Sequence, residues 1–230
     1  MTMLTGIPHR NQANDEILGT EQSLLRSVSV SAMKIGFCLY DGMTVLDFVG
    51  VYDPLIRLEE HLDGNVEWAI CGRTKIVRAD GLTIATDRIE PDLGEFDMVV
   101  VPGGRATRDL RHDADMISWI ATAAPCEYCV SVCTGSLLYG AAGLLDGKRA
   151  TTHPSATHLL AEYATVVDDR VVHDGNVVTS GGVTAAIDLG LYLTEVVGNR
   201  AIRKAIAKQM DYPYDELTFT RSYEHSDNSC

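Results

Sequence analysis

Three short segments of this chain are apolar along almost their whole length, at residues 33–40, 97–101 and 128–132. A strand with one face in water alternates apolar and polar side chains, whereas a strand buried on both faces is apolar throughout. Segments with helical spacing stand between these strands, and such alternation is typical of a parallel sheet between two layers of helices. The sequence therefore predicts an α/β fold with a mostly parallel sheet, in which reactive groups gather at the carboxyl ends of the strands.

The ends of the chain differ in character from its middle. Residues 1–33 are polar and lack a sustained period, and residues 212–230 are polar and rich in turn formers. We expect a disordered leader or a mis-assigned start at residues 1–33, a single folded domain at residues 34–211, and a polar C-terminal tail at residues 212–230.

The composition excludes several kinds of partner. Thirty-two acids against 19 bases give this acidic protein a formal net charge of −13, which repels nucleic acid and anionic membranes. No apolar run reaches the 18 or so residues of a membrane span, and the N-terminus lacks a signal-peptide core. Most of the six cysteines lie in strand-like runs, where reduced thiols are common. We expect a cytoplasmic protein without nucleic-acid or membrane partners.

Cys133 stands where the strand at residues 128–132 runs directly into a helix of small residues. A sharp strand-to-helix turn exposes its side chain at the sheet edge, and Gly135 lets the backbone bend tightly. A helix N-terminus also favours the thiolate over the thiol. Cys133 is our candidate nucleophile, although the short pattern alone is equally typical of a buried structural cysteine.

Asp47 interrupts an otherwise apolar stretch at residues 45–51. A carboxylate on an apolar helix face is costly unless it is paired or protonated, and burial would raise its pKa. Asp47 is therefore a candidate acid/base. The alternative, a carboxylate that points outward or caps a turn, is favoured by how seldom aspartate is buried.

Four further positions are candidates for lining a pocket. Gly103 and Gly104 follow a buried strand, where backbone N–H groups could bind an oxyanion, although an ordinary tight turn fits equally well. His153 ends a short strand and could orient or protonate a substrate, although a lone histidine is more often structural. Gly182 belongs to the segment at residues 179–184, which could place backbone donors at the opening of a helix and either line the pocket or merely pack.

A redox or metal role for Cys126 and Cys129 is disfavoured. Their Cys-x-x-Cys spacing enters a strand, on which side chains three positions apart point to opposite faces. No cluster of histidine, cysteine and carboxylate residues has metal-ligand spacing. We expect neither a metal nor an organic cofactor.

Residues 34 to about 210 resemble the ThiJ/PfpI superfamily. The resemblance rests on the segment at residues 37–50, Val-Pro-Gly-Gly at 101–104, Ser-Val-Cys-Thr-Gly at 131–135 and Arg-Ala-Thr-Thr-His at 149–153. It implies a flavodoxin-like three-layer sandwich of the class I glutamine amidotransferase type, a cysteine at a nucleophile elbow, and a homodimer.

Within that superfamily the chain looks most like the isocyanide (isonitrile) hydratases. The Leu46–Asp47 pair after the first strand matches their acid. The likeness implies a lyase in which Cys133 attacks an isocyanide to form a thioimidate, Asp47 transfers protons, Thr134 flanks the nucleophile, and an N-substituted formamide is released. A small neutral electrophile also suits an acidic protein with an anionic nucleophile.

At several positions the chain differs from other groups of the superfamily, and these differences weigh against some alternative functions. Thr134 stands where the peptidase-like members have histidine, so peptide cleavage is not expected, and Asp47 replaces the glutamate of the deglycase and glyoxalase-like members. Pro154 stands where hydratases have an aromatic residue. The 20 residues after Met210 are fewer than a helix-turn-helix pair needs, so we do not expect a DNA-binding regulator. A glyoxalase or deglycase acting on small aldehydes and a non-catalytic oxidation-sensing or ligand-binding protein remain open.

Overall fold

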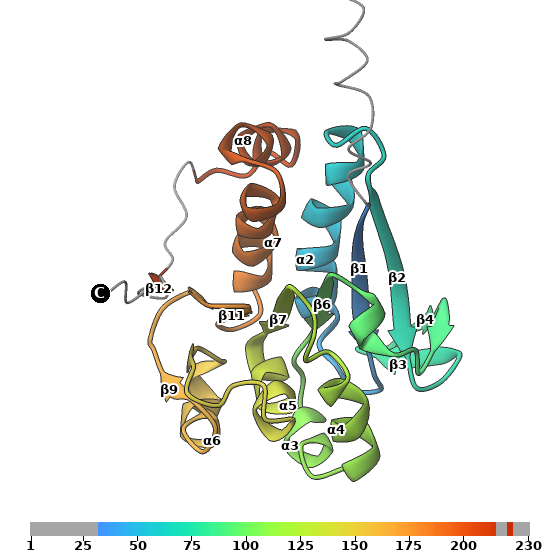
Figure 1. Ribbon diagram of the computed structural model, residues 1–230, viewed down its shortest axis with the longest axis vertical. Helices are drawn as coiled ribbons and strands as arrows, with labels where there is room; N and C mark the ends of the chain where they lie inside the picture. Colours follow the sequence, from blue (N-terminus) through green and yellow to red (C-terminus); the bar gives the residue numbers. More distant parts are fainter. Residues whose placement is uncertain (1–31, 215–219, 223–230) are drawn as a thin grey trace, which may run out of the picture. The chain divides into compact units, whose positions relative to one another are not determined.

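The computed structural model describes residues 32–214 and 220–222, and its centre is an eight-stranded sheet (Figure 1). The strands of this sheet are β1 (Met33–Leu39), β2 (Val66–Gly72), β5 (Arg88–Ile89), β6 (Met98–Val101), β7 (Tyr128–Val132), β10 (Val171–Asp174), β11 (Val177–Ser180) and β12 (Thr220–Ser222). Their order is β12-β10-β11-β7-β6-β1-β2-β5, and every neighbouring pair is parallel except β10 and β11. The predicted mostly parallel, flavodoxin-like sheet is confirmed.

The strand order reverses direction between β1 and β6. From β1 the chain adds β2 on one side, and it then crosses to the other side for β6, β7 and β11. In open parallel sheets a crevice forms outside the carboxyl ends of the strands at such a switch point. The loops that follow β1, β6 and β7 are therefore where a ligand or substrate is expected.

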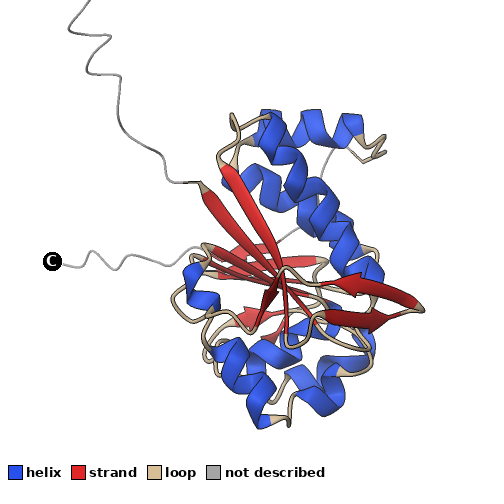
Figure 2. Ribbon diagram, turned by 90° about the vertical axis from the view of Figure 1, so that its right-hand side faces the viewer, coloured by secondary structure: helices blue, strands red, loops and turns tan. Residues whose placement is uncertain are grey.

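Helices cover both faces of the sheet (Figure 2). One layer holds α2 (Val45–Ile56), α7 (Ala185–Val197) and α8 (Arg200–Gln209), and the other holds α3 (Thr107–Leu110), α4 (Ala114–Ala121), α5 (Ser136–Ala141) and α6 (Thr157–Leu160). Four 3₁₀ turns are η1 (Arg57–Glu60), η2 (Leu93–Glu95), η3 (Cys133–Gly135) and η4 (Pro154–Ala156). Two small pairs lie outside the main sheet, the antiparallel β3 (Ile76–Ala79) and β4 (Leu82–Ala85) and the parallel β8 (Arg149–Ala150) and β9 (Thr165–Val166).

Helix α2 continues past Pro54 and ends at Ile56, although a proline inside a helix ordinarily interrupts it. Proline lacks the N–H that would bond the carbonyl of Gly50, so packing must hold the helix together. A Cβ atom added to Gly190 of α7 would lie 2.8 Å from Pro54 Cγ and 3.0 Å from the Gly50 oxygen. The bare glycine lets α7 pack directly against this turn, which explains why the helix persists.

The structure describes little of the predicted leader, but it describes part of the predicted C-terminal tail. Strand β1 begins at Met33, and the predicted leader lies almost wholly outside the described residues. The segment predicted as a polar tail contributes β12, which pairs in parallel with β10 at the edge of the sheet. No helix in the described part of the chain is long and apolar enough to cross a membrane.

Candidate active site

Cys133 lies at a sharp bend between β7 and η3, and its backbone has a φ of +55°. A left-handed conformation is costly for a residue with a Cβ atom and marks a position that the surrounding structure enforces. The bend brings Gly135 against β6, because a Cβ atom there would lie 2.3 Å from the Val101 oxygen. The predicted elbow is therefore present, but Cys133 is only 5% exposed, so the expectation that the turn exposes its side chain is wrong.

Hydrogen bonds hold the Cys133 backbone on both sides of the bend. Its N–H donates to the Gly181 oxygen at 3.0 Å. Its carbonyl accepts from Thr152 Oγ1 at 2.9 Å and from Ser136 Oγ at 3.2 Å. The strained conformation is thus supported by contacts from three separate segments.

Asp47 lies in the first turn of α2 and is fully buried, so the outward orientation that residue statistics favoured is wrong. Its Oδ2 accepts the Gly103 N–H at 3.0 Å, while Oδ1 has no hydrogen-bond partner among the described residues. A Cβ atom placed on Gly103 would lie 2.8 Å from both Asp47 Oδ2 and Cys133 Cβ. The carboxyl and the thiol therefore meet at one point, over a glycine that leaves room for both.

Burial dominates the titration of this pair. It raises the pKa of Asp47 to about 6, although the Gly103 N–H and the Cys133 side chain lower it. Burial, followed by the negative charge of Asp47, raises the pKa of Cys133 to about 11, although the N–H groups of Thr134 and Val183 lower it. Burial and the charge of Asp47 therefore outweigh the stabilisation of the thiolate that was predicted from the helix N-terminus. Between these two pKa values the pair carries one proton, which the two groups can exchange.

The two glycines expected to bind an oxyanion already have protein partners. The Gly103 N–H donates to Asp47, and the Gly104 N–H donates to Thr134 Oγ1 at 3.0 Å. The Thr134 hydroxyl in turn donates to the Gly104 oxygen at 3.0 Å. These amides therefore position the acid and the elbow rather than face a substrate, which corrects the oxyanion expectation.

His153 and Gly182 lie against each other at the border of the site. A Cβ atom on Gly182 would be 2.7 Å from His153 Cδ2. The His153 ring accepts the Ser155 N–H at 3.1 Å through Nδ1 and so caps η4. Its described contacts are thus structural, and the sequence expectation that it assists Cys133 stays a prediction.

Two groups near Cys133, Tyr40 and Thr152, were not singled out from the sequence, and a third, Val183, belongs to the segment expected to offer backbone donors. Tyr40 follows β1, is buried and donates to the Pro102 oxygen at 2.5 Å; its pKa is raised by burial, then by Asp47 and Cys133. Thr152 bonds the Cys133 carbonyl, and Val183 directs its N–H at the sulfur. Tyr40 ends a strand-like segment and Thr152 stands one residue before the end of another, so their places near carboxyl ends were the signal that could have identified them.

Replacing Gly103 with alanine is expected to lower the free energy of unfolding by about 1–3 kcal/mol, the usual cost of overpacking a core. The new Cβ would lie 2.6 Å from the Thr134 nitrogen and 2.8 Å from Asp47 Oδ2, so the elbow would have to shift. Denaturant unfolding measures this change. Gly181→Ala is the control, because a Cβ atom there would lie 3.9 Å from its nearest neighbours, and a similar loss of stability would contradict the explanation.

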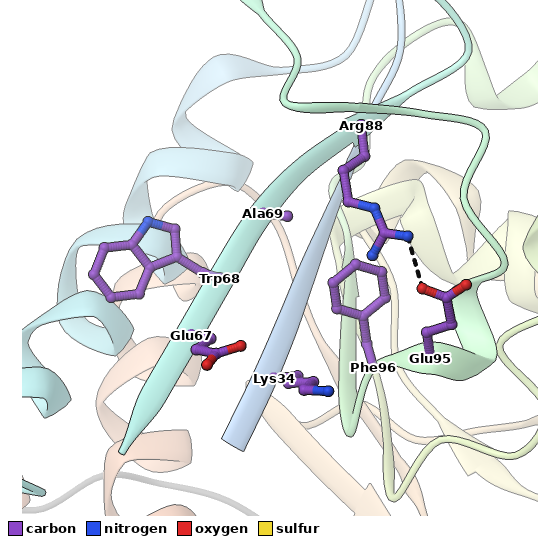
Figure 3. A pocket seen from close by; sticks show the side chains of 7 residues that line it. All are labelled: Lys34, Glu67, Trp68, Ala69, Arg88, Glu95 and Phe96. Atoms are coloured by element: carbon purple, nitrogen blue, oxygen red, sulfur yellow. Dashed lines mark hydrogen bonds and ion pairs between the residues drawn. The ribbon is translucent and has the colours of Figure 1, made fainter. Parts of the chain in front are cut away.

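A separate hollow of about 520 Å³ lies beside β1, β2 and β5 and the segment that precedes β6 (Figure 3). Cys133 is not among its lining residues. Its lining residues are Lys34, Glu67, Trp68, Ala69, Arg88, Glu95 and Phe96. Arg88 bonds Glu95 at 2.7 Å and lies over the Phe96 ring. The lining holds no cysteine, serine or histidine that could act as a nucleophile.

No group of three or more histidine, cysteine or carboxylate residues within the described ranges could hold a metal ion. Five cysteines, Cys38, Cys71, Cys126, Cys129 and Cys133, are buried free thiols. Of these five described thiols, Cys133 alone forms a hydrogen bond with a carboxyl, that of Asp47. The chemistry that these residues can supply is nucleophilic attack by sulfur coupled to proton transfer by Asp47.

Fold and site together define a flavodoxin-like α/β protein with a cysteine at a nucleophile elbow, paired with a buried acid. The chain belongs to the DJ-1/PfpI family, whose model matches residues 33–196. It is 37% identical over 190 residues to an isonitrile hydratase of Pseudomonas putida, with 80% of this chain and 82% of that protein aligned. It is also 29% identical to the HTH-type transcriptional regulator GbdR of Pseudomonas aeruginosa, over 77% of this chain and half of that protein.

Solved structures agree with this assignment. A ThiJ/PfpI family protein from Pseudomonas syringae superposes with a TM-score of 0.74 and 27% identity, covering 92% of this chain and 84% of that one. Drosophila melanogaster DJ-1beta superposes with a TM-score of 0.68 at 22% identity, over 80% of this chain and all of that one. The second likeness concerns the fold alone.

Proposed function

We propose that this protein is a cysteine-dependent isocyanide hydratase, a lyase that converts a small neutral isocyanide into an N-substituted formamide. The observation that carries the proposal is the buried Asp47 carboxyl against the Cys133 thiol, on an elbow with a φ of +55°. The similarity to an isonitrile hydratase over 80% of the chain supports the same reaction. Both groups that the reaction needs are present.

The first half of the reaction joins sulfur to carbon. The Asp47 carboxylate accepts the proton of the Cys133 thiol, and the resulting thiolate attacks the terminal carbon of R–N≡C. Asp47 then returns the proton to that carbon, which gives the thioimidate R–N=CH–S–Cys133. One S–C bond and one C–H bond form, and no oxidant or reductant is required.

The second half adds water and releases the enzyme. The Asp47 carboxylate takes a proton from water as the water oxygen attacks the thioimidate carbon, and Asp47 passes that same proton to the nitrogen. Collapse of the R–NH–CH(OH)–S–Cys133 adduct expels the sulfur, and the hydroxyl proton returns to the Asp47–Cys133 pair. The net change is R–NC plus water to R–NH–CHO.

The proposal predicts a rate that rises with pH through about 6. Below that value Asp47 is protonated and cannot accept the thiol proton, whereas the one-proton pair persists above it, up to about pH 11. Formamide production from an aryl isocyanide, followed by chromatography between pH 4.5 and 9, gives kcat/KM at each pH. A profile that is flat across pH 5 to 7 would contradict the assigned role of Asp47.

The same assay separates the alternatives. Consumption of methylglyoxal without isocyanide turnover would identify an aldehyde-directed enzyme that uses the same cysteine. Turnover of neither compound, with Cys133 converted to sulfenic or sulfinic acid by peroxide, would identify an oxidation sensor instead. Either result overturns the hydratase proposal.

A further inference from the structure

The loop at residues 181–184 connects β11 to α7 and lies directly against the elbow. The Gly181 oxygen accepts the Cys133 N–H, and the Gly181 N–H donates to the Arg170 oxygen at 3.0 Å. Two residues later, Val183 directs its N–H at the Cys133 sulfur. The position of this loop therefore decides whether the sulfur keeps its second backbone donor, because the Thr134 N–H supplies the first.

The side chain of Arg170, which lies outside the loop, holds the loop through Thr184. Thr184 is the N-cap residue of α7, yet its hydroxyl makes no capping bond to the helix. It accepts instead from the Arg170 guanidinium at 3.2 Å. The same guanidinium donates through Nε to the Asp188 carboxylate in the first turn of α7. Arg170 thus ties the loop to the helix that follows it.

Asp188 has a second partner from a distant part of the chain. Its other carboxylate oxygen accepts from the Tyr212 hydroxyl, beyond the end of α8. Tyr212 is itself held by its N–H, which donates to the Ala207 oxygen at 2.9 Å, and by an edge contact with the Tyr214 ring. Asp188, only 6% exposed, therefore has both oxygens engaged.

Stability alone does not account for this arrangement. Burial raises the pKa of Asp188 despite the opposing effect of Arg170, so the folded protein spends free energy to keep this carboxylate charged. The Arg170 side chain is 45% exposed, and an ion pair with one partly exposed member adds little net stability but can fix one geometry. The geometry fixed here is that of the loop against Cys133.

We propose that Asp188, Arg170 and Tyr212 form a latch of positioning residues that holds the 181–184 loop with the Val183 N–H against the Cys133 sulfur. The inference rests on the proposed function only in taking Cys133 as the nucleophile. The latch connects the segment after α8 to the site, so a change at residue 212 alters the reactivity of residue 133.

The test measures the alkylation rate of Cys133 by iodoacetamide against pH, with peptide mass spectrometry to separate it from the other cysteines. Loss of one N–H donor raises the pKa of the thiol, so Asp188→Asn and Arg170→Ala should react about tenfold more slowly at pH 7.5, the effect of one pKa unit. Tyr212→Phe removes one hydroxyl and should show a smaller loss of about threefold. Arg170→Lys should unfold like the wild type yet react slowly, because an ammonium lacks the fork that spans Asp188 and Thr184.

Glu195→Gln is the matched control, because it removes an ion pair with Arg203 between the same two helices, α7 and α8, away from the loop. It should leave the alkylation rate unchanged. Thermal unfolding identifies any variant that fails to fold. If the larger substitutions fail, the alkylation rate of Tyr212→Phe tests the latch by itself. Folded latch variants with wild-type rates, or an equal loss in Glu195→Gln, would overturn the latch. A wild-type protein that is alkylated at Cys133 but hydrates no isocyanide would refute the proposed function alone.

Discussion

Replacing Cys133 with serine should lower the rate of formamide production by about 10³-fold or more, the loss seen when a nucleophile is removed from a coupled site. The Asp47 carboxylate, with a pKa of about 6, can exchange a proton with a thiol whose pKa is about 11. A serine hydroxyl is a far weaker acid, so the same carboxylate leaves it protonated and poorly nucleophilic. The measurement is kcat with an aryl isocyanide at pH 7.5.

A second buried cysteine provides the control for this substitution. Cys126 Sγ donates to the Leu93 oxygen at 3.2 Å, a bond that a serine hydroxyl can also make. Cys126→Ser should keep full activity, because this thiol precedes β7 rather than following it. Acid quenching of the wild-type reaction should also leave the mass of one isocyanide on the peptide containing Cys133. Activity within tenfold of wild type in Cys133→Ser would exclude the covalent scheme.

Replacing Asp47 with asparagine should have two opposite effects. Activity should fall by about 10² to 10⁴-fold, the usual contribution of a general acid/base. Stability at pH 7.5 should rise by up to about 3 kcal/mol, because the folded protein raises the pKa of this acid from 3.8 to about 6. An asparagine can still accept the Gly103 N–H through its amide oxygen.

The sign of the stability effect follows from proton binding. The folded state binds more protons than the unfolded state between about pH 4 and 6, so the contribution of Asp47 to stability falls as pH rises through that window. The variant should therefore match the wild type at pH 4 and exceed it at pH 7.5. Denaturant unfolding at the two pH values measures both.

Asp53 is the control for this prediction because it lies on the same helix, with its exposed carboxylate paired to Arg57 at 3.1 Å. Asp53→Asn should change stability by less than about 1 kcal/mol and leave activity intact. An Asp47→Asn protein that is less stable than the wild type at pH 7.5 would show that the carboxylate is not strained by burial. One that retains wild-type activity would remove Asp47 from the mechanism.

The sheet could be read from the sequence because its strands carry a local signal. Residues 97–101 and 128–132 are apolar on both faces, and that pattern reflects burial beneath two helical layers wherever it occurs. Pro54 shows the limit of the same reasoning. Its local effect is to break a helix, but contact with Gly190 of α7 outweighs it, and no property of residues 45–58 reports that contact.

The sequence predicted the site less completely than the sheet, because the hydrogen-bond partners of site residues come from segments that are distant in the sequence. The glycines at 103 and 104 were correctly placed at the carboxyl end of a strand, yet their N–H groups are used by Asp47 and Thr134. The segment at residues 179–184 was expected to offer backbone donors, but the sequence could not single out Val183, because a backbone donor can come from any residue type. Only the packing of the loop before α7 against the elbow distinguishes it.

The sequence by itself determined the alternation of strands and helices and the place of Cys133 at a strand-to-helix junction, because both depend on the spacing of neighbouring residues. The tertiary structure decided that Asp47 is buried and that its carboxyl meets the thiol. These two groups follow different strands, β1 and β7, and come together only because the strand order reverses between β1 and β6. The raised pKa of each group depends on that meeting and on the burial around it, which no local pattern encodes.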